Sequence, residues 1–455
     1  MKCTSRAHSR VNLKSYLVLA AVLLLAGGVV LTRFAPAAFS PALARNAAQP
    51  RLVSVEPLPA LGGAMCQLEL ASASGTMAAL AMQAGASASD AARAIKDIDR
   101  APARTIKDPN PAFSAIAVEP ESGMLIVADE NLFRVLEYNR TENTPATARM
   151  SEPKRVIGGN LTKAEMMCGV YIDPKTLDTY VINNDTQDWL VVFSKNARGN
   201  VKPDRELAVP HGTFGISVDE GREEMYLPVQ HSNSVIVYPK YAKGEDKPLR
   251  EIIGNSTGLE DPHGVAADTG RNLLFVSNHG SVIATEPPAR MGARPREING
   301  SGRFEPPSIT VYNLDDDGNV KPLRIIEGPK TQLNWPMQIV LDKATGELFV
   351  ANDMDHSVLV FGVEDSGDAA PRRIIKGPRT GLRNPVGITL DEKNQELWIA
   401  SMGNHRAAVF SLNANGDVAP KRVIRGGPAD EKGLMIGNPG GVGYDTKRDQ
   451  ILVPN

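Results

Sequence analysis

The chain has 455 residues, of which 22% are charged, and its formal net charge at pH 7 is −2. This balance gives no reason to expect a nucleic acid or an anionic membrane surface as a partner. Three cysteines are too few for a scaffold held together by several disulfide bonds.

Residues 1–44 have the pattern of a targeting segment. Basic residues precede an uncharged apolar run over 16–31, and Ala42-Leu43-Ala44 resembles a signal-peptidase site. The run is short for a helix that spans a membrane, but the cleavage site lies unusually far from its end. We expect an apolar targeting helix, either cleaved as a signal peptide or kept as an N-terminal membrane anchor. Both interpretations place the remaining chain outside the cytoplasm, in a periplasm or secreted.

Residues 45–103 are rich in Ala, Ser and Gly, and we expect a partly disordered lead-in without chemistry of its own. Cys66 lies in this segment and Cys168 lies beyond it. The two either pair in an oxidising compartment or remain two small apolar residues, and spacing alone does not decide between these alternatives.

A unit of roughly fifty residues recurs over 104–455, the length of a propeller repeat. An acidic residue closes the first apolar run of each unit: Glu119, Asp173, Asp219, Asp268, Asp342, Asp391 and Asp445. A turn and a second apolar run follow, then a third run that ends on an aromatic residue and a fourth that begins with Arg. Four short strands per unit predict an all-β propeller of four-stranded antiparallel blades. The acids stand where a carboxylate caps a tight turn, so we assign them no chemistry.

The number of units favours seven blades over six. First and second strands occur seven times, and Arg104-Thr105-Ile106 supplies an additional outer strand before the first complete unit. We expect this strand to share a closing blade with the inner pair around Asp445, since such a blade would leave no exposed sheet edge.

The repeat resembles the NHL repeat of β-propeller proteins. The resemblance is carried by Pro385-Val386-Gly387-Ile388, Glu396-Leu397-Trp398-Ile399-Ala400 and Asn404-His405-Arg406. It implies the propeller fold over 104–455, but NHL-like propellers include protein-binding and RNA-binding scaffolds, and related propellers include streptogramin lyases, amidating lyases and lactonases. The fold alone therefore does not settle the function.

The fourth unit contains an insertion over 280–307 that is rich in Pro, Gly and Arg. Insertions in repeat proteins map to loops, often on the binding face. This one is either a lid over the central opening that offers arginines to an anion, or a tolerated loop with solvated side chains. The arginines concerned are Arg290, Arg294, Arg296 and Arg303.

Histidines occupy a restricted set of loops. His211 and His263 precede first strands, whereas His231, His279, His356 and His405 lie between second and third strands. Both kinds of connection emerge on the same face of a four-stranded propeller. His263 also begins an innermost strand, where a side chain points towards the central channel.

Two functions follow from these patterns. The first is a non-enzymatic binding scaffold that holds a protein, peptide or glycan on the face with the histidines and the insertion, without a cofactor. The alternative is a metal-assisted lyase or lactonase at the channel mouth, with His211 and His263 as ligands of a divalent metal or as acid and base. The structural interpretation of the same histidines is that they fix hairpins and line the rim.

Overall fold

The computed structural model describes residues 108–184, 187–283, 286, 296–298, 300–429, 431–433, 443–445, 447 and 450–452. Contacts divide the chain into Met1–Leu52 and Val53–Asn455, and every described residue belongs to the second unit. The expected targeting segment and the lead-in over 45–103 therefore lie outside the described residues. Within the part that is described, no helix is long and apolar enough to cross a membrane.

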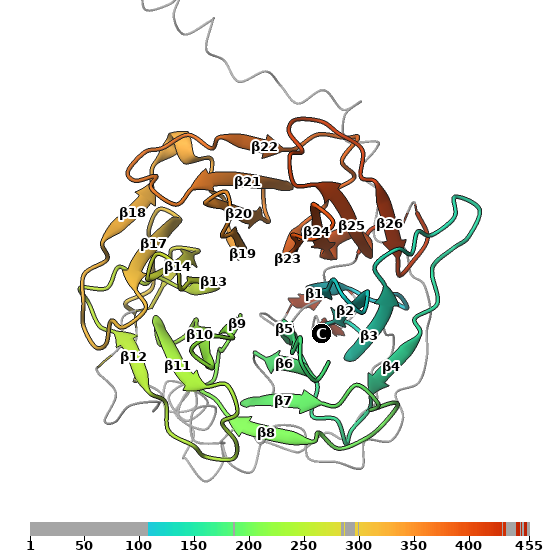
Figure 1. The fold of residues 1–455 in the computed structure, drawn as a ribbon, viewed down its shortest axis with the longest axis horizontal. Helices are drawn as coiled ribbons and strands as arrows, with labels where there is room; N and C mark the ends of the chain where they lie inside the picture. The colour runs from blue at the N-terminus through green and yellow to red at the C-terminus, as the bar shows by residue number, and fades with distance from the viewer. Residues whose placement is uncertain are drawn as a thin grey trace, which may run out of the picture. The chain divides into compact units, whose positions relative to one another are not determined.

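Six four-stranded antiparallel sheets surround a common centre like the blades of a propeller (Figure 1). In each blade the strands follow one another from the innermost to the outermost. Blades 1 to 3 are β1 (Phe113–Glu119), β2 (Met124–Asp129), β3 (Arg134–Asn139), β4 (Arg155–Gly158); β5 (Met167–Ile172), β6 (Thr179–Asn183), β7 (Trp189–Phe193), β8 (Arg205–Ala208); and β9 (Ser217–Asp219), β10 (Glu224–Val229), β11 (Ser234–Pro239), β12 (Arg250–Ile253).

Blades 4 to 6 are β13 (Pro262–Asp268), β14 (Leu273–Asn278), β17 (Ser308–Asn313), β18 (Arg324–Glu327); β19 (Pro336–Asp342), β20 (Glu347–Asn352), β21 (Ser357–Gly362), β22 (Arg373–Ile375); and β23 (Pro385–Asp391), β24 (Glu396–Ser401), β25 (Arg406–Ser411), β26 (Arg422–Arg425). The short strands β15 (Ser281–Val282) and β16 (Arg303–Phe304) pair within the insertion of blade 4. Two 3-10 turns, η2 (Pro329–Thr331) and η3 (Met402–Asn404), and the pair β27 (Gly443–Asp445) and β28 (Gln450–Leu452) complete the described elements.

The strands are apolar on both sides because each blade packs between two others. In one shared core, Phe275 and Val311 of blade 4 lie with Leu348 and Phe361 of blade 5. The second strand β14 is buried at every position. Burial of both faces explains why the apolar runs do not alternate with polar residues.

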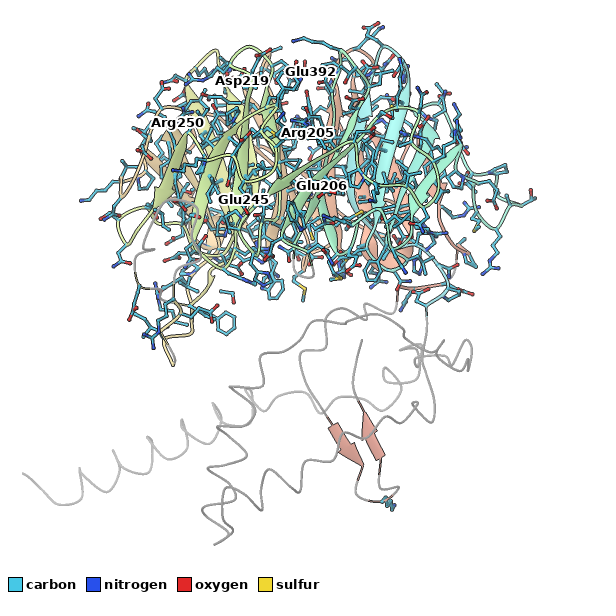
Figure 2. All side chains as sticks on the ribbon, turned by 90° about the horizontal axis from the view of Figure 1, so that it is seen from below. Arg205, Glu206, Asp219, Glu245, Arg250 and Glu392 are labelled. Atoms are coloured by element: carbon cyan, nitrogen blue, oxygen red, sulfur yellow. The ribbon has the colours of Figure 1, made fainter. Side chains whose placement is uncertain are left out.

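In the six blades, the recurring acids cap the turns between first and second strands, as the sequence predicted. The carboxylate of Asp219 accepts hydrogen bonds from the amides of Gly221 and Arg222. Asp173 accepts in the same way from Lys175 and Thr176. Figure 2 shows Asp219 and Glu392, from two such turns, on the same rim of the propeller.

The preference for seven blades is wrong: the described strands form six blades, and blade 6 packs directly on blade 1. Phe113 and Val127 of blade 1 share one apolar core with Trp398 and Val409 of blade 6. The expected inner pair at Asp445 does form as β27 and β28, in which Asp445 pairs with Gln450 as Asp391 pairs with Glu396. It is a separate two-stranded sheet, however, and Arg104-Thr105-Ile106 lies outside the described residues.

Neighbouring blades are joined at their outer strands by a repeated contact. A glycine in the loop between the third and fourth strands of one blade forms a parallel bridge with the outer strand of the preceding blade. The pairs are Ile157 with Gly199, Leu207 with Gly244, Ile252 with Gly318, Ile326 with Gly367 and Ile375 with Gly416.

Blade 1 makes this contact with a longer loop, which closes the ring against β26. Thr144 donates its amide to the carbonyl of Val423 at 2.7 Å, and its hydroxyl accepts from the amide of Arg425 at 2.8 Å. The amide of Ser151 donates to the carbonyl of Arg425 at 3.0 Å. We call residues 140–151 the closing loop.

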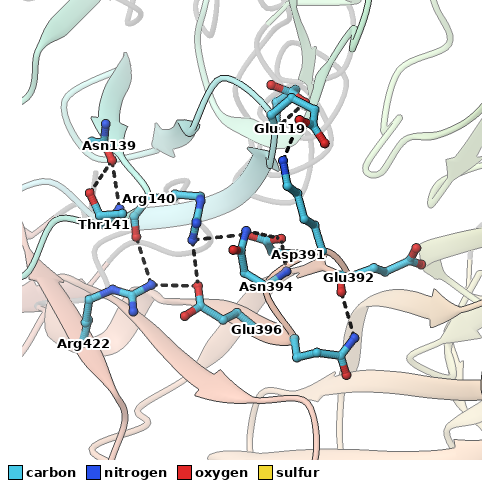
Figure 3. A network of polar contacts seen from close by, with 12 residues as sticks. Glu119, Asn139, Arg140, Thr141, Asp391, Glu392, Asn394, Glu396 and Arg422 are labelled. Carbon is cyan, nitrogen blue, oxygen red and sulfur yellow. Dashed lines mark hydrogen bonds and ion pairs between the residues drawn. The ribbon is translucent and has the colours of Figure 1, made fainter.

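An ionic network joins the same two blades at the rim that bears the acids (Figure 3). The Arg422 guanidinium donates to the carbonyl of Arg140 at 3.0 Å and to the Glu396 carboxylate at 2.7 Å. Arg140 lies 3.4 Å from Glu396 and 3.5 Å from Asp391. These contacts span two blades at opposite ends of the repeat array, so the ring is closed without a shared sheet.

Candidate ligand-binding face

Two kinds of loop meet on one face of the propeller: those between second and third strands, and those that enter each first strand. In every blade, a backbone amide of the loop between the second and third strands donates a hydrogen bond to a backbone carbonyl of the loop that enters the first strand. The pairs are Glu130 to Ala112, Asn184 to Met166, Gln230 to Gly212, His279 to Asp261, Asp353 to Trp335 and Met402 to Asn384. Every histidine that the structure describes lies in these loops or at the start of a first strand. We call this the histidine face.

The first strands of five blades begin with a β-bulge on this face. A bulge takes a residue out of the ladder and redirects its side chain. The residues left out of the ladder are Ser114, Cys168, His263 and Val386 in four blades, and Met337 with Gln338 in blade 5. Their positions were visible in the sequence, but the bulge that orients them was not.

Four of these side chains gather around Phe214, whose own strand has no bulge. Cys168, Met337 and Val386 share a buried core with Phe214 of blade 3. The ring of Phe214 in turn lies 4.3 Å from that of His263, centroid to centroid. We call these five residues the bulge cluster.

A central cavity of about 260 Å³ begins beyond the bulge cluster. It is lined by residues of all six first strands, starting with Gly169, Gly215 and Gly264. His263 is not among the lining residues, because its bulge places it among the packed side chains of the bulge cluster.

Glycine near the start of four first strands, at Gly169, Gly215, Gly264 and Gly387, allows these strands to come close enough for this packing. A Cβ atom on Gly264 would lie 2.5 Å from the carbonyl oxygen of Met337, and one on Gly215 would lie 2.7 Å from that of His263. Backbone atoms cannot yield as flexible side chains can. The glycines thus set the distance between neighbouring blades at this face.

His263, His279 and Asp261 form a buried polar group beside the bulge cluster. The imidazole rings of His263 and His279 are stacked with centroids 3.3 Å apart. The Asp261 carboxylate faces both rings, each Nδ1 lying 3.7 Å from a different carboxylate oxygen. Gln230 contacts Nε2 of His263 at 2.5 Å, and Trp335 stacks on His279 at 5.0 Å.

Burial governs the protonation of this group. Loss of hydration raises the pKa of Asp261 to about 7, against a smaller lowering by its hydrogen bond with Gln230. Burial lowers the pKa of His263 to about 3 and puts the pKa of His279 well below its ordinary value. Both imidazoles are therefore neutral at pH 7, which keeps a lone pair on each ring.

His211 is not part of this group. Its Nδ1 lies 2.9 Å from the carboxylate of Asp188, and its ring lies 4.9 Å from that of His231. His211 and His263, which the sequence suggested as a pair, thus lie in two different clusters. The neighbouring histidine of His211 is His231, and that of His263 is His279. His356 and His405 fix turns: both have left-handed backbone angles, and each ring faces a loop carbonyl.

The four arginines of the insertion have different positions. Arg290 and Arg294 lie outside the described residues. Arg296 is exposed. Arg303 is held by Glu305 at 2.5 Å and lies 3.7 Å from Glu260, so its charge is already matched by carboxylates.

Large exposed apolar side chains occur in the insertion and in the loops of blade 5, where Trp335 stacks on His279. Phe304 of β16 is 83% exposed, and Met354 and Trp335 are 51% and 44% exposed. Ile283 is exposed next to β15. Met354 and Trp335 belong to loops joined by amide hydrogen bonds, so they are neighbours. We call Ile283, Phe304, Trp335 and Met354 the apolar arc.

Sequence reasoning missed Asp261, Gln230 and Trp335. A signal for Asp261 existed, since Asp261-Pro262-His263 puts a carboxylate two residues from an imidazole. Asp261 and Trp335 occupy the same position before a first strand, with φ angles of 57° and 53°. His279 lies in the loop after β14, and only the fold brings its ring next to His263 and Asp261.

Comparison of the sequence with protein-family models and with curated proteins gives no match. Among solved structures, a chain of Kuenenia stuttgartiensis hydrazine synthase is 14% identical over 70% of this chain and 81% of its own, with a TM-score of 0.45. A functionally unknown protein from Desulfotomaculum acetoxidans is 15% identical over 75% of this chain and 89% of its own, also with a TM-score of 0.45. These likenesses are too weak to carry a functional argument, and the propeller rests on the strand pairing of this chain.

Proposed function

We propose that this chain is a non-enzymatic, extracytoplasmic propeller of the NHL type that binds a protein or peptide on the histidine face. The observation that carries the proposal is the apolar arc. Large exposed apolar side chains that lie together mark interaction sites more often than single ones do. The apolar arc flanks a buried polar group, so it offers both contact area and a few fixed polar partners.

The insertion supports this proposal. Strands β15 and β16 form a hairpin that presents Phe304, and the carbonyl of Ile283 accepts a hydrogen bond from Asn233 of blade 3 at 3.2 Å. The hairpin is therefore tied to two blades, which orders the surface before a partner arrives. The basic pattern ahead of the apolar run over 16–31 supports an extracytoplasmic location, with membrane contact only if that segment is not cleaved.

Capture experiments on envelope extracts test the proposal. We expect wild-type protein to enrich a defined partner that Phe304→Ala and Trp335→Ala variants lose, because aromatic anchors dominate such interfaces. Leu323→Ala is the matched control, since Leu323 is 49% exposed but precedes β18 on the opposite face. Equal capture by all variants would contradict the proposal, and selective binding to a glycan array would assign the face to a carbohydrate instead.

The second candidate is the metal-assisted lyase or lactonase. The group of Asp261, His263 and His279 favours it, since two imidazoles and a carboxylate are donors used by catalytic metals. His211, which the sequence suggested as the second ligand, belongs to another cluster. Metal-dependent turnover of a lactone or of an eliminable ester, lost on His279→Ala, would favour this candidate over the binding scaffold.

A further inference from the structure

Asp261, His263 and His279 combine the ligand types that Zn²⁺ and related divalent cations prefer. One ligand atom of each residue lies within 4.8 Å of the others. Each Nδ1 atom lies 3.7 Å from an oxygen of the Asp261 carboxylate. This separation is too long for a hydrogen bond, but two ligands held about 2.0–2.1 Å from one zinc ion lie roughly 3–4 Å from each other.

The His279 ring provides an independent observation. Its side chain is only 4% exposed. Among the described residues, its one contact at hydrogen-bond distance is the Met337 thioether sulfur, 3.0 Å from Nε2. A thioether is a weak acceptor, and a buried polar group without a strong partner is costly. A cation would give this ring the partner that the protein itself does not supply.

We propose that Asp261, His263 and His279 form a site for one divalent cation of the zinc class, with at least one coordination position left open. This inference does not rest on the proposed binding function, because it concerns the buried group and not the apolar arc. Nor does it require turnover of a substrate.

The surroundings fit such a site after a small rearrangement. Nδ1 of His263 lies 2.9 Å from the backbone carbonyl oxygen of Asp261, so coordination through Nδ1 requires the ring proton to move to Nε2. Gln230 lies 2.5 Å from Nε2 and accepts this proton through Oε1 once its terminal amide has turned away from Asn184, which donates to Oε1 at 2.6 Å. A partner of this kind orients a metal-bound histidine. The stacked rings must also open so that both lone pairs converge. The ring of His279 stacks on Trp335, which is 44% exposed and therefore has solvent on part of its surface.

Metal titration of the full chain tests the site. After EDTA treatment and dialysis, calorimetry with Zn²⁺ and elemental analysis should give one ion per chain. Loss of a ligand in His279→Ala or Asp261→Asn should weaken binding by more than about 100-fold, since loss of an orienting partner alone costs 10–100-fold. Gln230→Ala should fall in that smaller range. His211→Ala is the matched control and should bind as wild type does.

The fluorescence of Trp335 supplies a second readout of metal binding, and it can be measured on the wild-type protein alone. Because it stacks on His279, its fluorescence should change during the titration and saturate at the same equivalence point. Trp335→Phe should lose this signal and keep the stoichiometry. Absence of a one-to-one complex in the wild-type protein, or equal weakening by His211→Ala and His279→Ala, would overturn the proposal. Phe304→Ala should leave metal binding unchanged, which separates this result from the partner-capture experiment.

Discussion

Gly264 shows how single residues determine the architecture of the histidine face. It follows the redirected His263 and lies against the backbone of the next blade, where a side chain would meet both the carbonyl of Met337 and the amide of Ile339. A Cβ there would also lie 2.7 Å from the hydroxyl of Ser277. Because two of these three atoms belong to the backbone of β19, a substitution must move that strand and not only a side chain.

Gly264→Ala should destabilise the protein by about 1–3 kcal/mol, the usual cost of overpacking. Gly302→Ala is the control, since a Cβ there meets nothing within 4 Å and its backbone angle is ordinary. Its effect should stay within about 0.5 kcal/mol. Urea unfolding measures both. Equal stability of the two variants would show that the blades are not in close contact at Gly264.

A second residue-scale prediction concerns pH. Burial disfavours the charged form of His405, but the Asp108 carboxylate, 3.3 Å away, and the carbonyl of Pro111 outweigh this and raise its pKa above 6.5. The folded state then holds the proton more tightly than the unfolded state does. The resulting stability is complete below pH 6.5 and is lost as the pH rises through the raised pKa.

His405→Asn tests this sign, since Asn tolerates the left-handed backbone at this position (φ 57°). The wild-type protein should have a higher free energy of unfolding than the variant, and this difference should be larger at pH 6 than at pH 9. A difference that grows with pH would contradict the assigned contact with Asp108.

At the scale of elements, the closing loop replaces the glycine contact that joins the other blades. Thr144 and Ser151 provide donors and acceptors for β26, and the hydroxyl of Thr144 accepts from the amide of Arg425. Without that acceptor, a strand amide in a partly buried place would lack its partner, which costs about 1–3 kcal/mol.

Thr144→Val should therefore destabilise the protein by that amount and speed hydrogen exchange at the amide of Arg425. Thr141→Val is the control, because Thr141 lies in the same loop but is exposed and bonds only to Asn139. Unchanged exchange in Thr144→Val would mean that the loop does not hold β26.

These elements also show where sequence reasoning ended. The strands and turn-capping acids repeat along the chain, so their pattern alone predicted four-stranded blades and a single face with the histidines. The closing loop does not repeat: it has no glycine turn, and its partner Arg425 lies far away in the sequence. The contact between His263 and His279 does not repeat along the chain either. It depends on a β-bulge and on the packing of two loops, so the sequence pattern did not predict it.

At the scale of the whole molecule, the number of blades follows from which sheets meet at the closure. Counting strands in the sequence suggested seven, because first and second strands occur seven times and Arg104-Thr105-Ile106 supplies an additional outer strand. Packing decides otherwise: Trp398 and Phe113 lie in one core, which leaves no room for a sheet between blades 1 and 6. With six blades, the first strands converge closely enough for the bulge cluster to form.

Cross-linking across the closure tests this central claim most directly. The Lys393 ammonium of blade 6 lies 2.6 Å from the Glu121 carboxylate of blade 1, so a carbodiimide should join them by an amide bond. Mass spectrometry should detect the Glu121–Lys393 peptide in wild type and not in Lys393→Arg. Absence of this peptide, together with cross-links from Lys393 to the β27–β28 turn, would instead show a seventh blade between them.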